Sequence, residues 1–317
     1  MSEISAMPVR LDPRKFQDPF VTAKGDLRAR VALKSLDTLW FNTGTLCNLT
    51  CTNCYIESSP KNDRLVYLSA VEVARYLDEI ATLELGTRLI GFTGGEPFMN
   101  RELPAMLEEV LSRGHEAIVL TNAMKPMQHK KRALLALHER YGDRLTIRVS
   151  MDHYGAAVHE QERGRRSWTP TLDGLKWLAT NGFRVNVASR YLSGESEAML
   201  RDGFQRLFAE HEIPIDAVDP VALTIFPEMD ATADVPEITT ACWGILHKSP
   251  DSVMCATSRM VVKHKGAAAP SVIACTLLPY DALWDLGPTL AGARGSVPLN
   301  HPHCAKFCVL GGAACSA

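Results

Sequence analysis

Short strand-like runs alternate with longer helix-like segments along most of the chain. The strand-like runs are rich in β-branched and aromatic residues and span 38–43, 88–92, 115–121, 145–150, 183–189 and 217–225. Segments with apolar residues three and four positions apart lie between or after them, at 69–83, 102–112, 130–140, 171–180 and 197–210. Strands that alternate with helices form a parallel sheet covered by helices. The pattern therefore predicts an α/β fold with six strand–helix pairs.

The pattern changes after residue 236. Two strand-like runs, 259–262 and 271–274, flank Lys263-His264-Lys265-Gly266 and predict a β-hairpin. Proline and glycine are dense between residues 287 and 312, which indicates a loop-rich region. We therefore expect three parts: an N-terminal extension at 1–37, a strand–helix domain at 38–235 and a small loop-rich domain at 236–317.

Composition narrows the class of protein. The chain has 317 residues, of which 46% are hydrophobic, and its 34 Lys and Arg against 36 Asp and Glu give a net charge of −2. This balance gives no sign of a nucleic-acid partner. Neither a signal peptide nor an apolar run long enough for a membrane span is visible, so we expect a cytoplasmic protein. In such a protein, nine cysteines indicate metal or redox chemistry.

Three cysteines, Cys47, Cys51 and Cys54, follow the first strand-like run with the spacing C-x3-C-x2-C. Three thiolates at this spacing can hold three corners of a [4Fe–4S] cluster, which normally has four cysteine ligands. The next cysteine is Cys242, so one iron would keep an open position, as reactive metal sites do. The alternatives are a small zinc site or three unrelated core cysteines.

This triplet, followed by the aromatic residue Tyr55, resembles the signature of radical S-adenosylmethionine (SAM) enzymes. The resemblance implies that SAM chelates the open iron and that an electron from the cluster cleaves SAM to a 5′-deoxyadenosyl radical. It also implies a partial (β/α)6 barrel, an electron donor of the flavodoxin or ferredoxin type, and a position for Tyr55 near the adenine. An ordinary core aromatic is the alternative for Tyr55.

A second motif, Gly94-Gly95-Glu96-Pro97, follows the strand-like run 88–92. It resembles the GGEP motif that contacts the SAM amino group in this family. Glycine lets the backbone approach a ligand closely, and the carbonyl groups together with Glu96 can accept hydrogen bonds from an amine. On its own the motif could be a turn before a helix.

Barrel ligands bind at the C-terminal ends of the strands. Ser150 and Arg190 end the fourth and fifth predicted strands, and the resemblance implies that both contact the SAM carboxylate. A turn residue and a surface arginine are the alternatives. The basic loop at 153–168 is expected to be solvated rather than to bind substrate anions. Asp152, His153, Glu228 and Asp230 are acid–base candidates without a motif, so no general base is named.

The C-terminal cysteines resemble the twitch or SPASM extension of radical SAM enzymes, which carries auxiliary clusters. We expect one auxiliary [4Fe–4S] cluster held by Cys255, Cys275, Cys304 and Cys308, with Cys315 as a rival for either of the last two. Cys242 is expected to be a buried apolar thiol, and His301 and His303 to be polar loop residues. A zinc ribbon is the alternative.

The reaction is less specified than the family. An auxiliary cluster that accepts an electron favours oxidation, cross-linking or cyclisation of a substrate. Only 37 residues precede the first strand, which favours a small or carrier-bound substrate over a peptide, although peptide modification stays the alternative. An iron–sulfur electron carrier or a zinc-stabilised binding protein is the alternative of another class.

Overall fold

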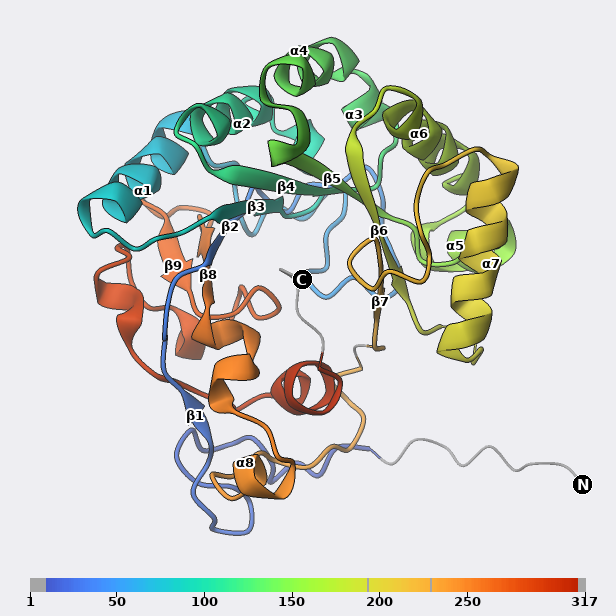
Figure 1. The fold of residues 1–317 in the computed structure, drawn as a ribbon. Coiled ribbons are helices and arrows are strands. Elements are labelled where there is room, and N and C mark those ends of the chain that lie inside the picture. Colours follow the sequence, from blue (N-terminus) through green and yellow to red (C-terminus); the bar gives the residue numbers. More distant parts are fainter. Residues whose placement is uncertain (1–9, 193, 229, 313–317) are drawn as a thin grey trace, which may run out of the picture.

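Six parallel strands form the centre of the molecule in chain order. The computed structural model describes residues 10–192, 194–228 and 230–312. The strands are β2 (Thr38–Asn42), β3 (Leu89–Thr93), β4 (Glu116–Thr121), β5 (Leu145–Ser150), β6 (Arg184–Arg190) and β7 (Leu223–Phe226), each paired in parallel with the next. They curve into an open arc in Figure 1. The partial (β/α)6 barrel is thereby confirmed.

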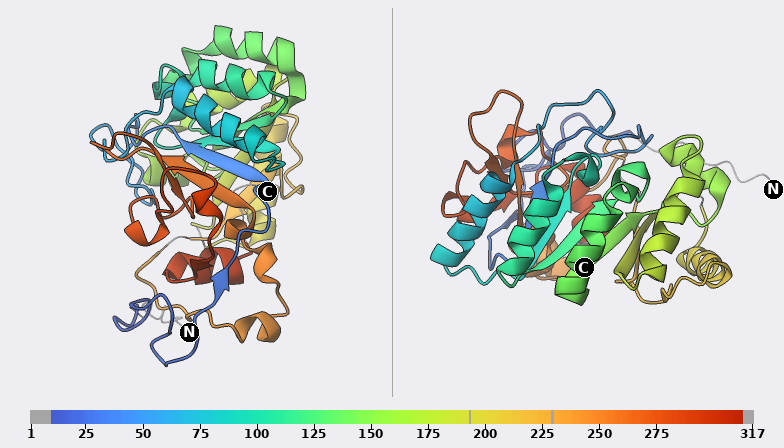
Figure 2. Two further views of the ribbon diagram at one scale, coloured as in Figure 1. Left: turned by 90° about the vertical axis from the view of Figure 1, so that its left-hand side faces the viewer. Right: turned by 90° about the horizontal axis from the view of Figure 1, so that it is seen from above.

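Helices cover the outer face of this arc (Figures 1 and 2). They are α1 (Ala70–Thr82), α2 (Leu103–Ser112), α3 (Lys125–Gln128), α4 (Lys131–Tyr141), α5 (Ala156–Arg163), α6 (Trp168–Thr180) and α7 (Glu197–Glu210). Ser69 and Glu72 form a capping box that starts α1. Alternate strand residues such as Leu39 and Phe41 join the core under the helices. The intervening residues face the barrel interior, where they leave room for a site at the strand ends.

Trp40 shows how tightly the barrel interior is filled. Its side chain is fully buried and lies over Gly91 of the neighbouring strand. A Cβ atom at Gly91 would stand 2.3 Å from the Trp40 ring. This position therefore requires glycine, because the indole occupies the space of any side chain there.

The predicted C-terminal hairpin is confirmed, and it extends the barrel sheet. β8 (Ser258–Val262) and β9 (Ser271–Ile273) pair antiparallel, and β8 also pairs in parallel with β2. The eight-stranded order is therefore β7-β6-β5-β4-β3-β2-β8-β9. The orange and red segments in Figure 1 consequently lie across the open side of the arc. Sequence patterning did not predict this pairing, because the strands are more than 200 residues apart.

Residues 10–37 pack on the C-terminal part of the chain. β1 (Arg30–Val31) pairs with β10 (Val297–Pro298), and Thr240 donates its N–H to the carbonyl of Leu27 close to α8 (Cys242–Ile245). Arg28 forms an ion pair of 2.6 Å with Glu237, and both side chains are buried. The two ends of the described chain thus share a second hydrophobic core that is distinct from the core under the barrel helices.

Two elements differ from the predictions. β7 begins at Leu223 rather than residue 217, because Asp219 and Pro220 make a turn in which Leu223 donates its N–H to the Asp219 carbonyl. Helix α5 occupies the expected basic loop, and its buried face contains His159 and Glu162 instead of an apolar stripe. Among the described residues, no helix is both long enough and apolar enough to cross a bilayer.

Candidate functional site

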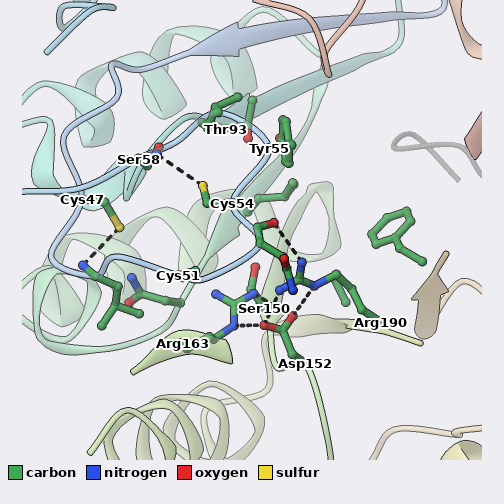
Figure 3. Close-up of a pocket in the computed structure, with 18 of the residues that line it drawn as sticks. Cys47, Cys51, Cys54, Tyr55, Ser58, Thr93, Ser150, Asp152, Arg163 and Arg190 are labelled. Atoms are coloured by element: carbon green, nitrogen blue, oxygen red, sulfur yellow. Dashed lines mark hydrogen bonds and ion pairs between the residues drawn. The ribbon is translucent and has the colours of Figure 1, made fainter. Parts of the chain in front are cut away.

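A pocket opens at the C-terminal ends of strands β3 to β7 and gathers most of the predicted site. Its described lining includes Cys47, Cys51, Cys54, Tyr55, Gly94, Gly95, Ser150 and Arg190. These residues come from the loop after β2 and from the ends of β3, β5 and β6. Figure 3 shows the three cysteines on one side of the pocket and the charged residues below them. Parallel strands place their carboxyl ends at one edge, so distant motifs meet there.

The three cysteines lie on one loop that enters the pocket. The N–H groups of Leu49 and Ser58 donate to the sulfurs of Cys47 and Cys54, each at 3.4 Å. Burial raises the pKa of Cys47 to about 12 and also raises the pKa of Cys51. A thiol in such a place ionises when a metal binds it, and N–H donors to sulfur stabilise bound thiolates. The loop therefore fits an iron–sulfur cluster with three protein ligands.

Gly94 and Gly95 form a close backbone contact beneath this loop. Gly95 donates its N–H to the carbonyl of Gly44 at 2.8 Å, and Gly94 has a φ of +134°. A Cβ at Gly95 would stand 2.2 Å from the carbonyl oxygen of Leu46. The motif thus joins the end of β3 to the cysteine loop through main-chain atoms only. Glycine is required at Gly95 because the two backbones touch.

Glu96 lies differently from the expectation for a SAM ligand. Its carboxylate is buried and accepts hydrogen bonds from the Thr121 hydroxyl at 2.8 Å, from the Asn122 N–H at 2.9 Å and from the Phe98 N–H at 3.1 Å. Glu96 is not among the described residues that line the pocket. Burial raises its pKa to about 7. The side chain therefore ties the end of β3 to the end of β4.

Arg190 and Arg163 meet at one buried carboxylate, that of Asp152. Arg190 donates to both oxygens of Asp152, at 3.2 and 3.0 Å, and Arg163 forms an ion pair of 2.8 Å with it (Figure 3). Burial alone would raise the pKa of Asp152, but the two guanidinium groups hold it well below its usual range. Arg190 also lies 3.5 Å from the buried carboxylate of Glu162, so the two cations at the pocket floor face two carboxylates, and only the guanidinium N–H groups that these leave over can bind a further anion.

Arg163 was missed by the sequence analysis. The basic run Arg163-Gly164-Arg165-Arg166 was interpreted as a solvated loop, whereas Arg163 ends helix α5 and lines the pocket with only 14% of its side chain exposed. Its neighbours Arg165 and Arg166 are exposed. The signal that could have separated them is Gly164, which ends the helix with a φ of +97° and directs the two following arginines away.

The far wall of the pocket is apolar. Phe226 at the end of β7 stacks on Phe307 with ring centroids 5.5 Å apart, and Leu277 also lines the pocket. Phe307 and Leu277 both belong to the C-terminal part of the chain. Asp152, Arg163 and Arg190 are the charged residues in the described lining, so this wall presents no charge. A ligand against it is held by apolar contact rather than by ion pairs.

Four C-terminal cysteines line a second, smaller cavity. They are Cys255, Cys275, Cys304 and Cys308, which come from both sides of the hairpin and from the segment beyond β10. Leu277 donates its N–H to the Cys275 sulfur at 3.4 Å, as Leu49 does to Cys47. Burial raises the pKa of Cys255 to about 11 and raises that of Cys304 well above its usual value. The structure thus brings together the four predicted ligands of an auxiliary cluster.

The remaining candidates lie apart from this second cavity or outside the described residues. Cys315 lies outside the described residues. Cys242 is half-buried at the start of α8, where it accepts the Thr239 N–H at 3.3 Å. His301 and His303 are neighbours, with ring centroids 4.6 Å apart, and do not line the cavity. Within the described chain, no three His, Cys, Asp or Glu side chains are grouped closely enough to hold a single metal ion.

Three of the four acid–base candidates do not line the large pocket, as far as the chain is described. His153 contacts Glu195 at 2.7 Å, and Asp230 accepts the N–H of Thr232. Glu228 is exposed. Asp152 does line the pocket, but its lowered pKa makes it a poor base. The geometry therefore assigns no general base.

Comparison with known proteins agrees with this geometry. A sequence model of the radical SAM superfamily matches residues 41–207, more than half of the chain. The antilisterial bacteriocin subtilosin biosynthesis protein AlbA of Bacillus subtilis is 30% identical over 144 residues, which cover 45% of this chain and 30% of AlbA. A GTP 3′,8-cyclase of Rhodococcus opacus is 33% identical over 184 residues, which cover 54% of this chain and 50% of the cyclase. The chain thus spans half or less of these relatives.

Two solved structures have the same fold. Streptococcus suis SuiB bound to precursor peptide SuiA aligns with a TM-score of 0.60 and 12% identity, over 83% of this chain and 66% of SuiB. The protein anSMEcpe with bound SAM aligns with a TM-score of 0.57 and 15% identity, over 81% of this chain and 79% of anSMEcpe. At these identities the likeness concerns the fold alone.

Proposed function

This chain belongs to the radical SAM superfamily, and from that premise we propose that it oxidises or cross-links an apolar part of its substrate in the large pocket. As a radical SAM enzyme it binds a [4Fe–4S] cluster and SAM, which together supply a 5′-deoxyadenosyl radical that removes a hydrogen atom from the substrate. One observation carries the proposal. Two short segments of the chain reach both cavities, because Leu277 and Phe307 line the large pocket while the nearby Cys275 and Cys308 line the small one.

The residues around the large pocket have separate roles in this proposal. Cys47, Cys51 and Cys54 hold the first cluster. The main chain of Gly94 and Gly95 accepts the SAM amino group, and Arg190, supported by Ser150, binds the SAM carboxylate. Arg190 suits this role because Asp152 fixes the direction of its guanidinium group, which keeps further N–H donors beyond those that Asp152 and the Asn53 carbonyl accept. Tyr55 lies beside the adenine. Glu96 positions the strand end rather than contacting SAM.

The second cavity supplies the redox partner. We assign Cys255, Cys275, Cys304 and Cys308 to one auxiliary [4Fe–4S] cluster with a cysteine on every iron. Such a cluster accepts one electron and leaves no iron open to substrate. When bound there, the cluster would accept one electron from a substrate that has lost a hydrogen atom, and release of one proton to solvent would complete a two-electron oxidation.

The chemistry of the pocket favours a peptide side chain over a nucleotide. The two arginines in the described lining are already paired with Asp152, and Arg190 also with Glu162, so the SAM carboxylate takes the N–H donors that remain. A triphosphate would have no further cation to bind. AlbA takes part in the biosynthesis of a bacteriocin and SuiB was crystallised with a precursor peptide, which supports the same class of substrate. This inverts the sequence-based preference for a small or carrier-bound substrate.

Iron and product analysis test the proposal. The protein is reconstituted anaerobically and treated with SAM and dithionite, and 5′-deoxyadenosine is measured. We expect the product from the wild type and none after Cys47, Cys51 and Cys54 are replaced together by alanine, with about four irons retained per chain. Continued SAM cleavage in that variant would refute the assignment of the first cluster. One zinc and no iron would replace the auxiliary cluster with a zinc site.

A separate experiment tests the proposed contact between Arg190 and the SAM carboxylate. Arg190→Met removes a charge-assisted contact to the SAM carboxylate, which is worth about 1.5–3 kcal/mol. The dissociation constant of SAM should therefore rise roughly tenfold to a hundredfold, measured by equilibrium dialysis on protein with full iron content. Arg201→Met is the matched control, because Arg201 pairs with Glu197 on α7, which belongs to the outer helices. Equal SAM affinity in both variants would remove Arg190 from the SAM site.

A further inference from the structure

A buried arginine beside the second cavity has no carboxylate partner. Arg259 lies on β8 and is 1% exposed. Its guanidinium donates to four main-chain carbonyls, those of Cys255 at 2.6 Å, Ser258 at 2.8 Å, Ala293 at 3.0 Å and Gly295 at 3.4 Å. Within the described chain, no Asp or Glu side chain forms an ion pair with it. Its hydrogen bonds are therefore satisfied while its charge is not.

Another buried arginine, Arg28, shows how a buried positive charge is usually balanced. Arg28 is also enclosed and also donates to carbonyls, but it pairs with Glu237 at 2.6 Å. Arginine does not lose its proton in proteins, and an isolated charge inside a protein is costly unless another charge or a metal site compensates for it. The environment of Arg259 therefore calls for a nearby anion that no carboxylate provides.

The neighbouring cavity provides a place for that anion. Arg259 donates to the carbonyl of Cys255, whose own side chain lines the cavity together with Cys275, Cys304 and Cys308. Burial lowers the pKa of Arg259, and negative charge on Cys255 and Cys275 would raise it. An iron–sulfur cluster with four thiolate ligands carries a net negative charge, which grows by one unit when the cluster accepts an electron.

We propose that Arg259 is the fixed counter-charge of the C-terminal cluster and raises its reduction potential. This inference rests on the proposed auxiliary cluster. A cation at constant distance stabilises the reduced cluster more than the oxidised one, because the reduced form has one more negative charge. The arginine cannot turn toward solvent, since the four carbonyls hold it in place. The cluster is thereby made a better acceptor for the electron that leaves the substrate.

The test is a redox titration of the C-terminal cluster alone. The full chain with Cys47, Cys51 and Cys54 replaced by alanine serves as the parent, so that a single cluster gives the paramagnetic signal of the reduced state. In Arg259→Met on this background, the ratio of reduced to oxidised cluster at the parent's midpoint should fall about tenfold, which is a shift of about 59 mV for one electron. Arg259→Lys keeps the charge and should stay close to the parent.

Arg294→Met is the matched control. Arg294 is exposed and lies between Ala293 and Gly295, whose carbonyls accept from Arg259, so its removal changes the same net charge in solvent, where it is screened. The proposal is overturned if Arg259→Met leaves the potential unchanged, or if Arg259→Lys shifts it as far as Arg259→Met. If Arg259→Met binds no iron, Arg259→Lys and Arg259→Gln decide, and equal behaviour of these two would overturn it.

A parent without iron is a different result. If the parent variant contained no iron, the auxiliary cluster of the proposed function would be refuted, and there would be no reduction potential with which to test the role of Arg259. If the parent contains iron and its reduction potential does not change when Arg259 is replaced, the proposed role of Arg259 as counter-charge would be refuted, while the assignment of the cluster would stand. The two failures are therefore distinguishable by iron content alone.

Discussion

Replacing Glu96 by alanine separates a structural role from a direct role in SAM binding. The carboxylate accepts the N–H groups of Phe98 and Asn122 and the hydroxyl of Thr121, all within the barrel. The two N–H groups cannot turn elsewhere, and each buried donor left without an acceptor costs about 1–3 kcal/mol. Below the raised pKa of Glu96, where its ionisation does not oppose folding, Glu96→Ala should therefore lower the free energy of unfolding by about 2–6 kcal/mol, with water in the vacated space reducing the loss.

The measurement is urea denaturation of the reduced, metal-free protein, followed by SAM binding to the reconstituted protein. Glu102→Ala is the matched control, because Glu102 caps the exposed N–H of Ala70 at 2.9 Å and its loss should cost about 1 kcal/mol or less. In Glu96→Ala, SAM affinity per folded molecule should change by less than tenfold. A large loss of SAM affinity with unchanged stability would refute this reasoning and return the Glu96 side chain to the SAM site.

Three further predictions follow from contacts described above. Gly95→Ala places a Cβ 2.2 Å from the Leu46 carbonyl and should abolish 5′-deoxyadenosine formation, whereas Gly244→Ala, which meets no atom within 4 Å, should not. Asp152→Asn removes the carboxylate that pairs with Arg163 and leaves Arg190 with Glu162 at 3.5 Å, so it should lower the unfolding free energy by about 3–5 kcal/mol in urea. Asp63→Asn in an exposed pair should cost about 0–1 kcal/mol, and equal losses would contradict the prediction. Burial raises the pKa of Glu96 from 4.5 to about 7, so the folded chain keeps a proton that the unfolded chain releases. Stability should fall as pH rises through this window, on the order of 3 kcal/mol, and this part of the pH dependence should vanish in Glu96→Ala.

The barrel was predictable because its signals are local. Apolar spacing within single segments predicted five long helices and six strands, since each element must bury one face regardless of its neighbours. The motifs at Cys47 and Gly94 predicted where ligands gather, because parallel strands end at one edge. The pairing of β8 with β2 could not be predicted in this way, since a strand edge leaves no trace in the composition of its distant partner.

Side-chain direction was the other limit. The expected and observed positions of two side chains differ. Glu96 was expected in the pocket and lies in the barrel wall, whereas Arg163 was expected in solvent and lies in the pocket. The direction of Arg163 depends on the backbone angle at Gly164, and that of Glu96 depends on the neighbouring strand β4. Residue type alone reveals neither. The partners of Arg259 could not be predicted for a related reason. A charged residue inside a predicted hairpin gives no sign of which carbonyls will accept its hydrogen bonds or which cavity will lie nearby.

The pairing of β8 with β2 also determines how the protein can be divided. All five residues of β2 are buried, and without β8 one edge of this strand would offer its free N–H and C=O groups to any other chain. Unprotected, apolar strand edges promote aggregation through strand-to-strand contact. A fragment that ends at residue 235 should therefore precipitate or exchange strands between copies. The C-terminal hairpin therefore protects the edge of strand β2 from pairing with other chains, and this role does not depend on which cluster the loops beyond the hairpin hold.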